Sequence, residues 1–429
     1  MTVIPFIRSW ARACRWLVWL AVIWATSVAA ETAPDLGPVR LNGFGSLALT
    51  RTLSVGDQSL RRDISQQTQA HTNSFATDSR LGLQLHYDAR PDLELVSQVV
   101  IKKRLPDSPA DGALEWLFAS YRPRDDWTIR VGRTNTDIFL LSDVGSVGFA
   151  YPWIRPNSDF YIALPLYTMD GVDATWTVQS GDARWKLKGF AGNSTTQGIL
   201  SINPGELYNF KITPAIGLVV SRENDGLLLR ATVAKARVSA DMSPRASMAL
   251  ESLRQLAASP YPEVARQANE LAKRADLTAR SANFYEIGVN YERDNWLISA
   301  EFSQVDMDTG TRAARSAYAS VGHRFGDLTL YGMVGKSVSS FDAQAIPNWQ
   351  ALGPEAQALG IAAATLANGA RVDQRSWSMG ARWDVHPQLA LKLQFDQFWV
   401  APNGGALWIG DDQQASKPRV WSGGLDFVF

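Results

Sequence analysis

The chain has 429 residues, 46% of them hydrophobic, and its 42 Lys and Arg equal its 42 Asp and Glu in number. That balance gives no basic excess of the kind that marks nucleic-acid-binding proteins. A mean hydropathy of -0.13 and a single long apolar run exclude a membrane protein built of several helices, each of which needs about 20 apolar residues.

The apolar run lies at the N-terminus and predicts an export signal over residues 1–30. Three arginines come before or at the start of the apolar stretch 16–23, and Val28-Ala29-Ala30 supplies small residues ahead of a cleavage site. An uncleaved membrane anchor is the alternative. Cleavage would leave a net charge of -3 and would remove Cys14, the only cysteine. A chain without thiols has no disulfide, no thiolate metal site and no cysteine nucleophile.

From about residue 39 onward, apolar and polar side chains alternate. Along 79–88, for example, one face is apolar and the other polar: Leu81, Leu83, Leu85 and Tyr87 against Arg80, Gln84, His86 and Asp88. Alternation over about 10 residues is typical of a strand with lipid on one side and water on the other. The sequence therefore predicts an all-β fold, a transmembrane antiparallel β-barrel of about 16 strands. A soluble β-sandwich has shorter strands and is disfavoured.

The predicted strands are separated alternately by short turns and by long loops. Short turns on one side and long loops on the other are typical of outer-membrane barrels. The predicted strands run over 39–51, 79–88, 92–102, 115–122, 127–133, 170–178, 183–192, 209–221, 227–238, 283–292, 296–305, 316–325, 328–336, 375–385, 388–397 and 419–429.

Two of the long loops have helical composition. Residues 243–279 are rich in Ala, Leu, Glu, Arg and Lys, and two prolines divide them, which predicts two short helices in an extracellular loop insertion. Residues 354–369 predict a further Ala-rich helix. These helices either cap the pore mouth, bind a partner, or form a surface insertion without a role in permeation.

The C-terminal segment resembles the final strand that the barrel-assembly machinery recognises in outer-membrane proteins. Alternate residues at the end of the chain are apolar: Trp421, Leu425, Phe427 and Phe429, with Gly423 between them. Together with the segments Leu41-Asn42-Gly43-Phe44-Gly45, Val131-Gly132-Arg133 and Val321-Gly322-His323-Arg324-Phe325-Gly326, the pattern resembles the Gram-negative porin superfamily of sixteen-stranded trimeric barrels. The resemblance covers the chain from residue 31 to 429 and implies a homotrimer.

The resemblance also implies that the third long loop, residues 134–169, folds into the barrel and narrows the pore. Its segment 142–156 carries many Gly, Pro and aromatic residues, and a freely solvated loop has little need of them. The Pro-Glu-Phe-Gly-Gly element of enterobacterial porins is absent, which leaves the shape of the narrowest point open.

Charge placement then sets which solutes pass. The loop contributes candidate constriction residues Asp137, Asp143, Asp159 and Arg155, and strand parity turns Arg40, Arg80, Lys102 and Arg130 toward the lumen. A second inward basic stripe comprises Arg184, Lys186 and Lys188, joined by Arg382 and Lys392 on later strands. Glu286, Glu292, Glu301, Asp384 and Asp396 also face inward, so the sign of the ion preference stays open.

The residues predict a porin, a water-filled channel for passive diffusion of small hydrophilic solutes and ions across the outer membrane. Expected partners are outer-membrane lipid, such solutes and the assembly machinery. No catalytic residue, cofactor or metal site is predicted, because only His86 suggests acid–base chemistry and Asp306-Met307-Asp308-Thr309-Gly310 lacks the rest of a calcium loop. A substrate-specific or gated channel, a binding or adhesion protein, and a barrel enzyme are the alternatives.

Overall fold

The computed structural model describes residues 37–53, 58–62, 64–66, 73–104, 110–161, 167–199, 207–241, 244–276, 278–307, 314–369, 371–410 and 414–429. The predicted export signal lies outside these ranges. The chain divides into a short unit, Met1–Arg40, and a large unit, Leu41–Phe429, which holds the fold described below.

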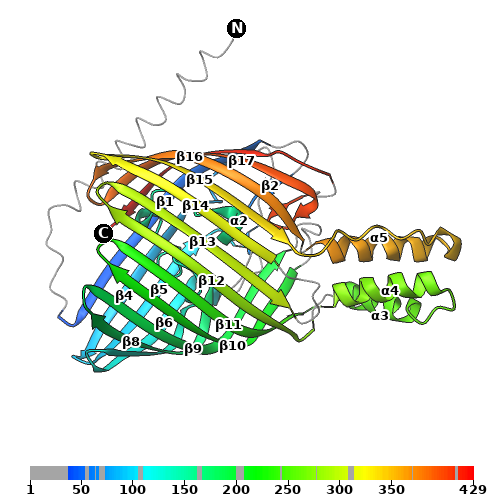
Figure 1. The fold of residues 1–429 in the computed structure, drawn as a ribbon, viewed down its shortest axis with the longest axis horizontal. Coiled ribbons are helices and arrows are strands. Elements are labelled where there is room, and N and C mark those ends of the chain that lie inside the picture. The colour runs from blue at the N-terminus through cyan, green and yellow to red at the C-terminus, as the bar shows by residue number, and fades with distance from the viewer. Residues whose placement is uncertain are drawn as a thin grey trace, which may run out of the picture. The chain divides into compact units, whose positions relative to one another are not determined.

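Sixteen long antiparallel strands form a closed barrel (Figure 1). They are β1 (Val39–Leu53), β4 (Arg80–Arg90), β5 (Leu93–Lys102), β6 (Leu114–Arg124), β7 (Trp127–Asn135), β8 (Thr168–Ser180), β9 (Ala183–Ile199), β10 (Leu207–Asn224), β11 (Leu227–Asp241), β12 (Arg280–Arg293), β13 (Trp296–Met307), β14 (Ala314–Phe325), β15 (Leu328–Ser339), β16 (Val372–His386), β17 (Leu389–Gly405) and β19 (Arg419–Val428). Each of the sixteen pairs with the next along the chain, and β1 closes the ring by pairing with both β4 and β19.

Short elements complete the described chain. The strand β3 (Asn73–Ser74) pairs with β1, and β2 (Ser59–Leu60) pairs with β18 (Trp408–Ile409) in a separate small sheet. Single turns of helix are η1 (Ala110–Ala113), η2 (Gly148–Ala150), α2 (Ser158–Tyr161) and η3 (Gln350–Leu352). None of the helices in the described ranges combines the length and the apolar character that a membrane crossing requires.

The predicted sixteen-stranded barrel is confirmed, and every predicted strand corresponds to one of the long strands. The structure extends several of them toward the long loops: β9 continues to Ile199 and β17 to Gly405. Small and polar residues such as Asn193, Ser194 and Thr195 fill the extension of β9, so the alternation that marks the lipid-facing part of the strand is lost there.

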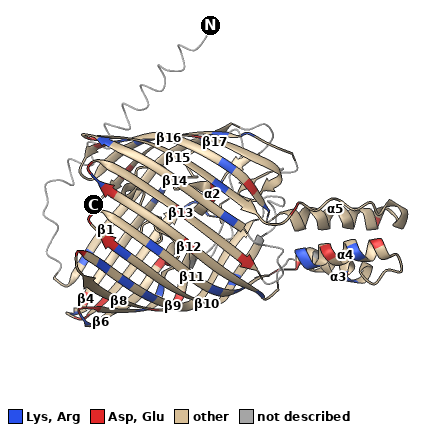
Figure 2. Cartoon of the chain, viewed as in Figure 1, with Lys and Arg blue, Asp and Glu red and all other residues tan. Residues whose placement is uncertain are grey.

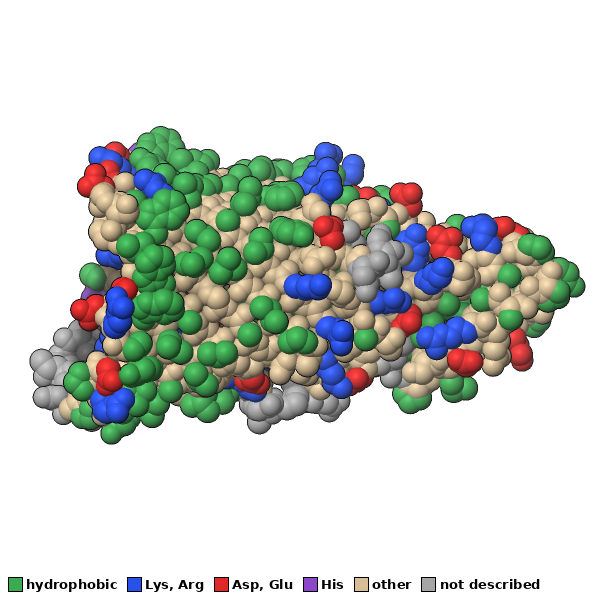
Figure 3. All heavy atoms as spheres, turned by 60° about the horizontal axis from the view of Figure 1, so that its bottom comes forward, with side chains coloured by type: hydrophobic (Ala, Val, Ile, Leu, Met, Phe, Trp, Pro, Cys, Tyr) green, Lys and Arg blue, Asp and Glu red, His purple; other side chains and the backbone are tan. Residues whose placement is uncertain are grey.

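The outer wall of the barrel is apolar, as the alternation predicts. Leu81, Leu83 and Leu85 are exposed on the outside of β4, while Arg80 on the same strand is buried. Aromatic side chains gather at the short-turn end, where Tyr121, Trp127, Trp176, Trp185, Trp296 and Trp383 are exposed. Figure 3 shows this end as a crowded hydrophobic rim that a band of charged side chains borders.

The predicted helices form, and they pack against one another. Helices α3 (Pro244–Leu256) and α4 (Pro262–Ala275) follow β11, and α5 (Pro354–Asn368) follows β15. Their shared core includes Leu253, Leu271 and Ala364, and Trp349 donates through its indole N–H to Gln267 at 2.9 Å. The two loops thus build one three-helix projection at the long-loop end of the barrel (Figure 1).

The outward face of β4 gives a test of the lipid-facing assignment. We expect Leu85→Arg to lower the free energy of unfolding by about 2–4 kcal/mol, the cost of a cation near the middle of the bilayer. Gln84→Arg on the inward face is the matched control and should cost much less. Denaturant titration of the barrel in lipid vesicles measures both, and equal losses would contradict the assignment.

Candidate functional site

The loop between β7 and β8 lies inside the barrel, as predicted. Its polar atoms bond to inward side chains from strands around the whole wall. The contacts join Ser146 to Glu115 on β6, the Asp137 carbonyl to Arg230 on β11, the Leu140 N–H to Glu301 on β13, the Trp153 indole to Ser320 on β14, and the Ile154 N–H to Gln394 on β17. We call residues 136–161 of this segment the lumen loop.

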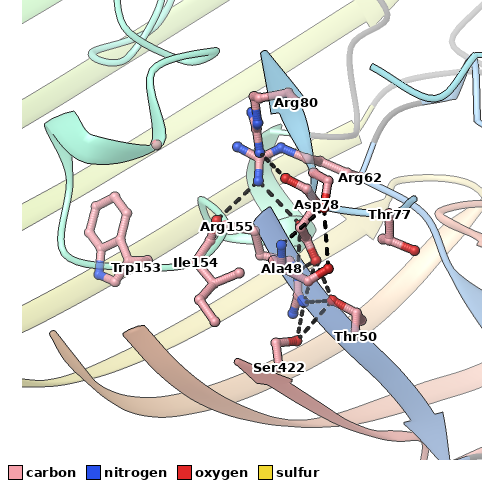
Figure 4. Close-up of polar contacts among 12 residues, drawn as sticks. Ala48, Thr50, Arg62, Thr77, Asp78, Arg80, Trp153, Ile154, Arg155 and Ser422 are labelled. Carbon is pink, nitrogen blue, oxygen red and sulfur yellow. Dashed lines mark hydrogen bonds and ion pairs between the residues drawn. The ribbon is translucent and has the colours of Figure 1, made fainter. Parts of the chain in front are cut away.

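Arg155 fastens the lumen loop to the wall (Figure 4). Its side chain is almost fully buried and forms ion pairs with Asp78 at 2.8 Å and with Asp396 at 2.6 Å. It also donates to the hydroxyls of Thr50 and Ser422. The guanidinium therefore joins the lumen loop to β1, β17, β19 and Asp78, which precedes β4, and we call this contact the latch.

The latch is electrostatically tight. Burial alone would lower the pKa of Arg155, but the carboxylates of Asp78 and Asp396 outweigh it and hold the pKa above its ordinary value. Burial would likewise raise the pKa of Asp78, yet Arg155 and Arg62 hold that pKa well below its usual range. Both groups stay charged at any physiological pH, so this contact does not titrate.

Two predicted wall cations hold backbone carbonyls of the lumen loop. The Lys392 ammonium donates to the carbonyls of Gly148, Tyr151 and Trp153 at 2.6–3.0 Å and pairs with Asp426 at 2.7 Å. Arg382 donates to the carbonyl of Phe149 at 2.6 Å and lies over its ring. Both cations thus hold the loop, whereas the sequence predicted that they would line the pore as part of a basic stripe.

The start of the lumen loop is held by a second ion cluster. Asp137 pairs with Lys188 on β9 at 2.7 Å and with Arg230 on β11 at 2.6 Å. Burial alone would raise the pKa of Asp137, but the two cations hold it well below its usual value. Asp137 is thus an anchor carboxylate, and Lys188 is the one member of the predicted β9 stripe that reaches the loop.

Asp159, in α2, is buried and forms no ion pair with a cation of the described residues. Its carboxylate accepts hydrogen bonds from Gln374 and from Ser376 at 2.6 Å on β16. Burial raises the pKa of Asp159 to about 6, since the hydrogen bonds only partly offset it and the charge of Asp396 adds to it. Asp159 is therefore the group of the lumen loop that titrates near neutral pH.

Apolar side chains explain the unusual composition of the lumen loop. Phe139, Trp153 and Phe160 are buried against inward aromatic residues of the wall, including Phe284 and Tyr318. Their rings meet edge to face, with centroids 5.2 Å apart for Phe139 and Phe160 and 6.1 Å for Trp153 and Tyr318. This arrangement adds to the energy of burial, so the cluster contributes to holding the loop in addition to the ion pairs.

The lumen loop leaves two hollows inside the barrel. One, of about 140 Å³, lies toward the long-loop ends of β4 to β8 and is lined by charges from four predicted site residues: Arg80, Lys102, Asp143 and Arg155. Arg62 and Glu115 complete its charges. We call it the upper cavity.

The lower cavity, of about 480 Å³, lies toward the short-turn ends of β11 to β16. Phe149, Asn290, Arg324 and Asp384 are among its lining residues. Leu141 of the lumen loop lines both cavities, so the loop forms the partition between them.

A second segment bridges the mouth on the long-loop side. Residues 58–62 and 64–66 pass between β17 and β9, which lie on opposite sides of the ring in strand order. Arg61 donates to the carbonyl of Ile199 on β9 at 2.6 Å and to that of Ala406 after the end of β17 at 2.5 Å. Leu60 and Trp408 are buried together in an apolar cluster beside this contact. We call residues 58–62 and 64–66 the mouth bridge.

Several predicted site residues lie elsewhere than expected. Arg40 is exposed at the start of β1, far along that strand from Thr50, which meets the loop, so its assignment to the constriction is wrong. Arg184 and Lys186 are exposed near the short-turn end, below the loop. Arg130 faces inward but pairs with Asp173 at 2.8 Å. Asp143 accepts a hydrogen bond from Asn135 at 2.7 Å and is exposed to the upper cavity.

Important residues were absent from the prediction. Three of them bind the lumen loop: Arg62, Asp78 and Arg230. The fourth, Arg61, ties the mouth bridge to β9. Strand parity could have found Arg230, which faces inward on β11 beside Thr232. Arg61, Arg62 and Asp78 belong to an irregular loop without a period, and no sequence signal marks them. His86 faces inward and contacts Glu94 at 2.7 Å, which gives this histidine a structural partner.

The latch predicts a measurable change in loop exposure. Arg155→Ala would leave Asp396 buried without its cation and Asp78 with Arg62 alone, which costs about 3–5 kcal/mol. With Ile154→Cys as reporter, we expect maleimide labelling of the loop to speed up by more than tenfold. Arg122→Ala, at an exposed ion pair with Glu94, is the control and should leave labelling unchanged. A latch variant that labels like the parent would contradict the assignment.

The raised pKa of Asp159 predicts pH-dependent docking. The docked loop binds this proton more tightly than a free loop does, so docking loses stability as the pH rises from about 4 to about 6 and then levels off. The loss is at most about 3 kcal/mol. Comparing reporter labelling in the parent and in Asp159→Asn at each pH cancels the ionisation of the thiol. The labelling rate of the parent divided by that of Asp159→Asn should rise between about pH 4 and about pH 6. A ratio that does not change with pH would contradict the assignment.

Comparisons with known proteins support the fold. No family model and no curated protein matches the sequence. Among solved structures, the chain is similar to OmpF of Salmonella typhi in complex with daunomycin, at 12% identity and a TM-score of 0.53 over 93% of this chain and 100% of that one. It is also similar to the outer membrane channel DcaP of Acinetobacter baumannii, at 12% identity and a TM-score of 0.51 over 91% of this chain and 97% of that one. Its similarity to the anion-selective porin of Comamonas acidovorans has 11% identity and a TM-score of 0.50 over 91% of this chain and 100% of that one. The chain thus has the sixteen-stranded barrel fold of Gram-negative porins.

Proposed function

We propose that the protein is an outer-membrane channel for passive diffusion of small hydrophilic solutes. The observation that carries the proposal is a closed barrel with an apolar outer wall and two cavities inside, each lined in part by charged side chains and separated by the lumen loop. The lumen loop and the mouth bridge both narrow the path. They favour the substrate-specific or gated form of channel over a wide, unselective pore.

The upper cavity favours small anions. Its lining carries four cations, Arg62, Arg80, Lys102 and Arg155, against two carboxylates, Glu115 and Asp143. Lys102 pairs with Glu115 at 3.2 Å, Arg155 is neutralised by the latch, and Arg62 also pairs with Asp78 at 3.2 Å. The remaining excess is modest, so we infer a preference for anions and not an absolute barrier to cations.

The assembly of the barrel belongs to the same proposal. A homotrimer needs an outward patch that a second copy can cover, and Ala317, Ala319 and Val321 on β14 face outward as a stretch of small residues. The terminal residues Trp421 and Phe429 are exposed, and the Phe429 backbone pairs with Gly43. We propose that this terminal strand is the signal read by the barrel-assembly machinery.

The three-helix projection supports a second candidate function, binding of a partner. Met248 on α3 and Tyr261 at the start of α4 are large apolar residues that are mostly exposed. Deleting residues 243–279 would abolish partner capture under this candidate and would leave conductance intact.

Conductance in planar bilayers tests the channel. We expect discrete ohmic steps and, in a salt gradient, a reversal potential of anion-selective sign. Asp143→Asn removes a cavity carboxylate and should raise anion preference, whereas Lys102→Met removes a cation and should lower it. Shifts of several millivolts in opposite directions are expected.

Two results would contradict the proposal. If the purified, folded barrel gives no conductance steps in planar bilayers, the protein is not a channel. Unchanged reversal potentials in both variants would place the conducting path away from the upper cavity. Arg184→Gln, at the exposed short-turn end, is the control for unspecific effects of charge.

A further inference from the structure

Five cations face outward at the long-loop end of one side of the barrel. They are Arg315 on β14, Lys336 on β15, Arg375 on β16, Arg419 on β19 and Arg51 on β1, and all five are exposed. β17 lies between β16 and β19 and contributes Trp399, with the Arg375 guanidinium 5.4 Å from the centre of its ring. These strands are adjacent in the ring, so the side chains form a continuous line, which we call the cation row.

The register brings like charges together. Lys336 lies directly opposite Arg375 in the β15–β16 pair. Arg51 lies opposite Trp421, two residues from Arg419, so the two arginines are diagonal neighbours across β1 and β19. Like charges placed directly opposite each other on one face destabilise a sheet. A bound anion would turn this repulsion into attraction.

No member of the cation row forms an ion pair with a carboxylate of the described residues. Arg315 and Arg419 each donate to a glutamine, Gln304 and Gln397. Other outward cations at the same end of the barrel do have carboxylate partners: Arg133 pairs with Asp170 at 2.7 Å and Lys211 with Asp241 at 2.6 Å. At the short-turn rim, too, exposed arginines such as Arg124 are paired. Within the described ranges, the absence of carboxylate partners is therefore a local feature of this row.

The height of the row places it at a membrane surface. On β15, the outward residues between the short turn and Lys336 are apolar, and they begin at Leu328. Eight residues of a strand tilted by about 40° rise roughly 20 Å, close to the apolar band of about 25 Å in such barrels. The cations thus lie where lipid headgroups begin. Figure 3 shows, on another face, that charged side chains lie at the short-turn end and toward the helices and leave most of the wall between them free of charge.

We propose that the cation row binds the phosphorylated headgroup of a glycolipid in the leaflet that surrounds the long loops. The row crosses six strands, about 24 Å at the usual strand spacing, so it fits a broad headgroup with several phosphates better than one phosphodiester. Arginine forks bind phosphate oxygens in pairs, and Lys336 adds a point charge. This inference rests on the proposed outer-membrane location but not on conduction.

The test compares two double variants of the full chain after purification in detergent. Lys336→Gln with Arg375→Gln removes the centre of the row, and Arg133→Gln with Lys211→Gln removes paired outward cations as the matched control. Bis-phosphorylated lipid A is titrated and the bound fraction is measured by native mass spectrometry. We expect about thirtyfold weaker binding in the row variant, roughly fivefold for each cation, and little change in the control.

Three outcomes would overturn the proposal. One is an equal loss in both double variants. Another is equal binding of lipid A from which the phosphates have been removed. The third is equally tight binding of phosphatidylglycerol, which would replace the glycolipid by any anionic lipid. Bilayer conductance of the row variant should match the parent, so a failure here is distinguishable from failure of the channel proposal.

Discussion

The buried guanidinium of Arg155 is the contact on which the interior of this barrel depends. A loop placed inside a ring of strands brings its own carbonyl and amide groups away from water, and each such group costs free energy unless it finds a partner. Lys392 and Arg382 donate to loop carbonyls from one half of the wall, and Arg230 donates to the Asp137 carbonyl from the other. Arg155, from the loop itself, binds the wall carboxylates Asp78 and Asp396. Most cations at the level of the loop are therefore engaged in holding it.

The strands could be predicted because the contrast between lipid and water repeats along each of them. Alternation along 79–88 or 388–397 indicates both a strand and its lipid-facing side, and the structure has the strands β4 and β17 at these positions. Composition alone marks the helices, because Ala, Leu and Glu fill them. Their packing into one projection joins loops that are far apart in the sequence, and no local pattern contains that information.

The site was predicted less completely for a geometric reason. The alternation of side chains along a strand shows which of them face the lumen, but it does not show how far along the barrel axis the lumen loop lies. Arg80 and Lys392 share a face with Arg184 and Lys186 in the pattern, yet only the first two meet the lumen loop. The lumen loop contacts only a narrow belt of the wall. The position of this belt along the barrel axis depends on where the contacts of Arg155 lie. Asp78 sits just ahead of a strand, and its role depends on Arg155, which is distant in sequence.

The lumen loop and the mouth bridge are coupled through one carboxylate, that of Asp78. Arg62 belongs to the mouth bridge and pairs with Asp78 at 3.2 Å, while Arg155 of the lumen loop binds the same carboxylate at 2.8 Å. Arg62 also donates to the carbonyls of Ile154 and Gly145 and to the Tyr151 hydroxyl of the loop. Displacing the mouth bridge therefore removes three contacts from the loop, and releasing the latch frees Asp78 to hold Arg62 alone. A solute anion that competes for Arg62 in the upper cavity would loosen both segments together, which links occupancy of the cavity to opening of the path.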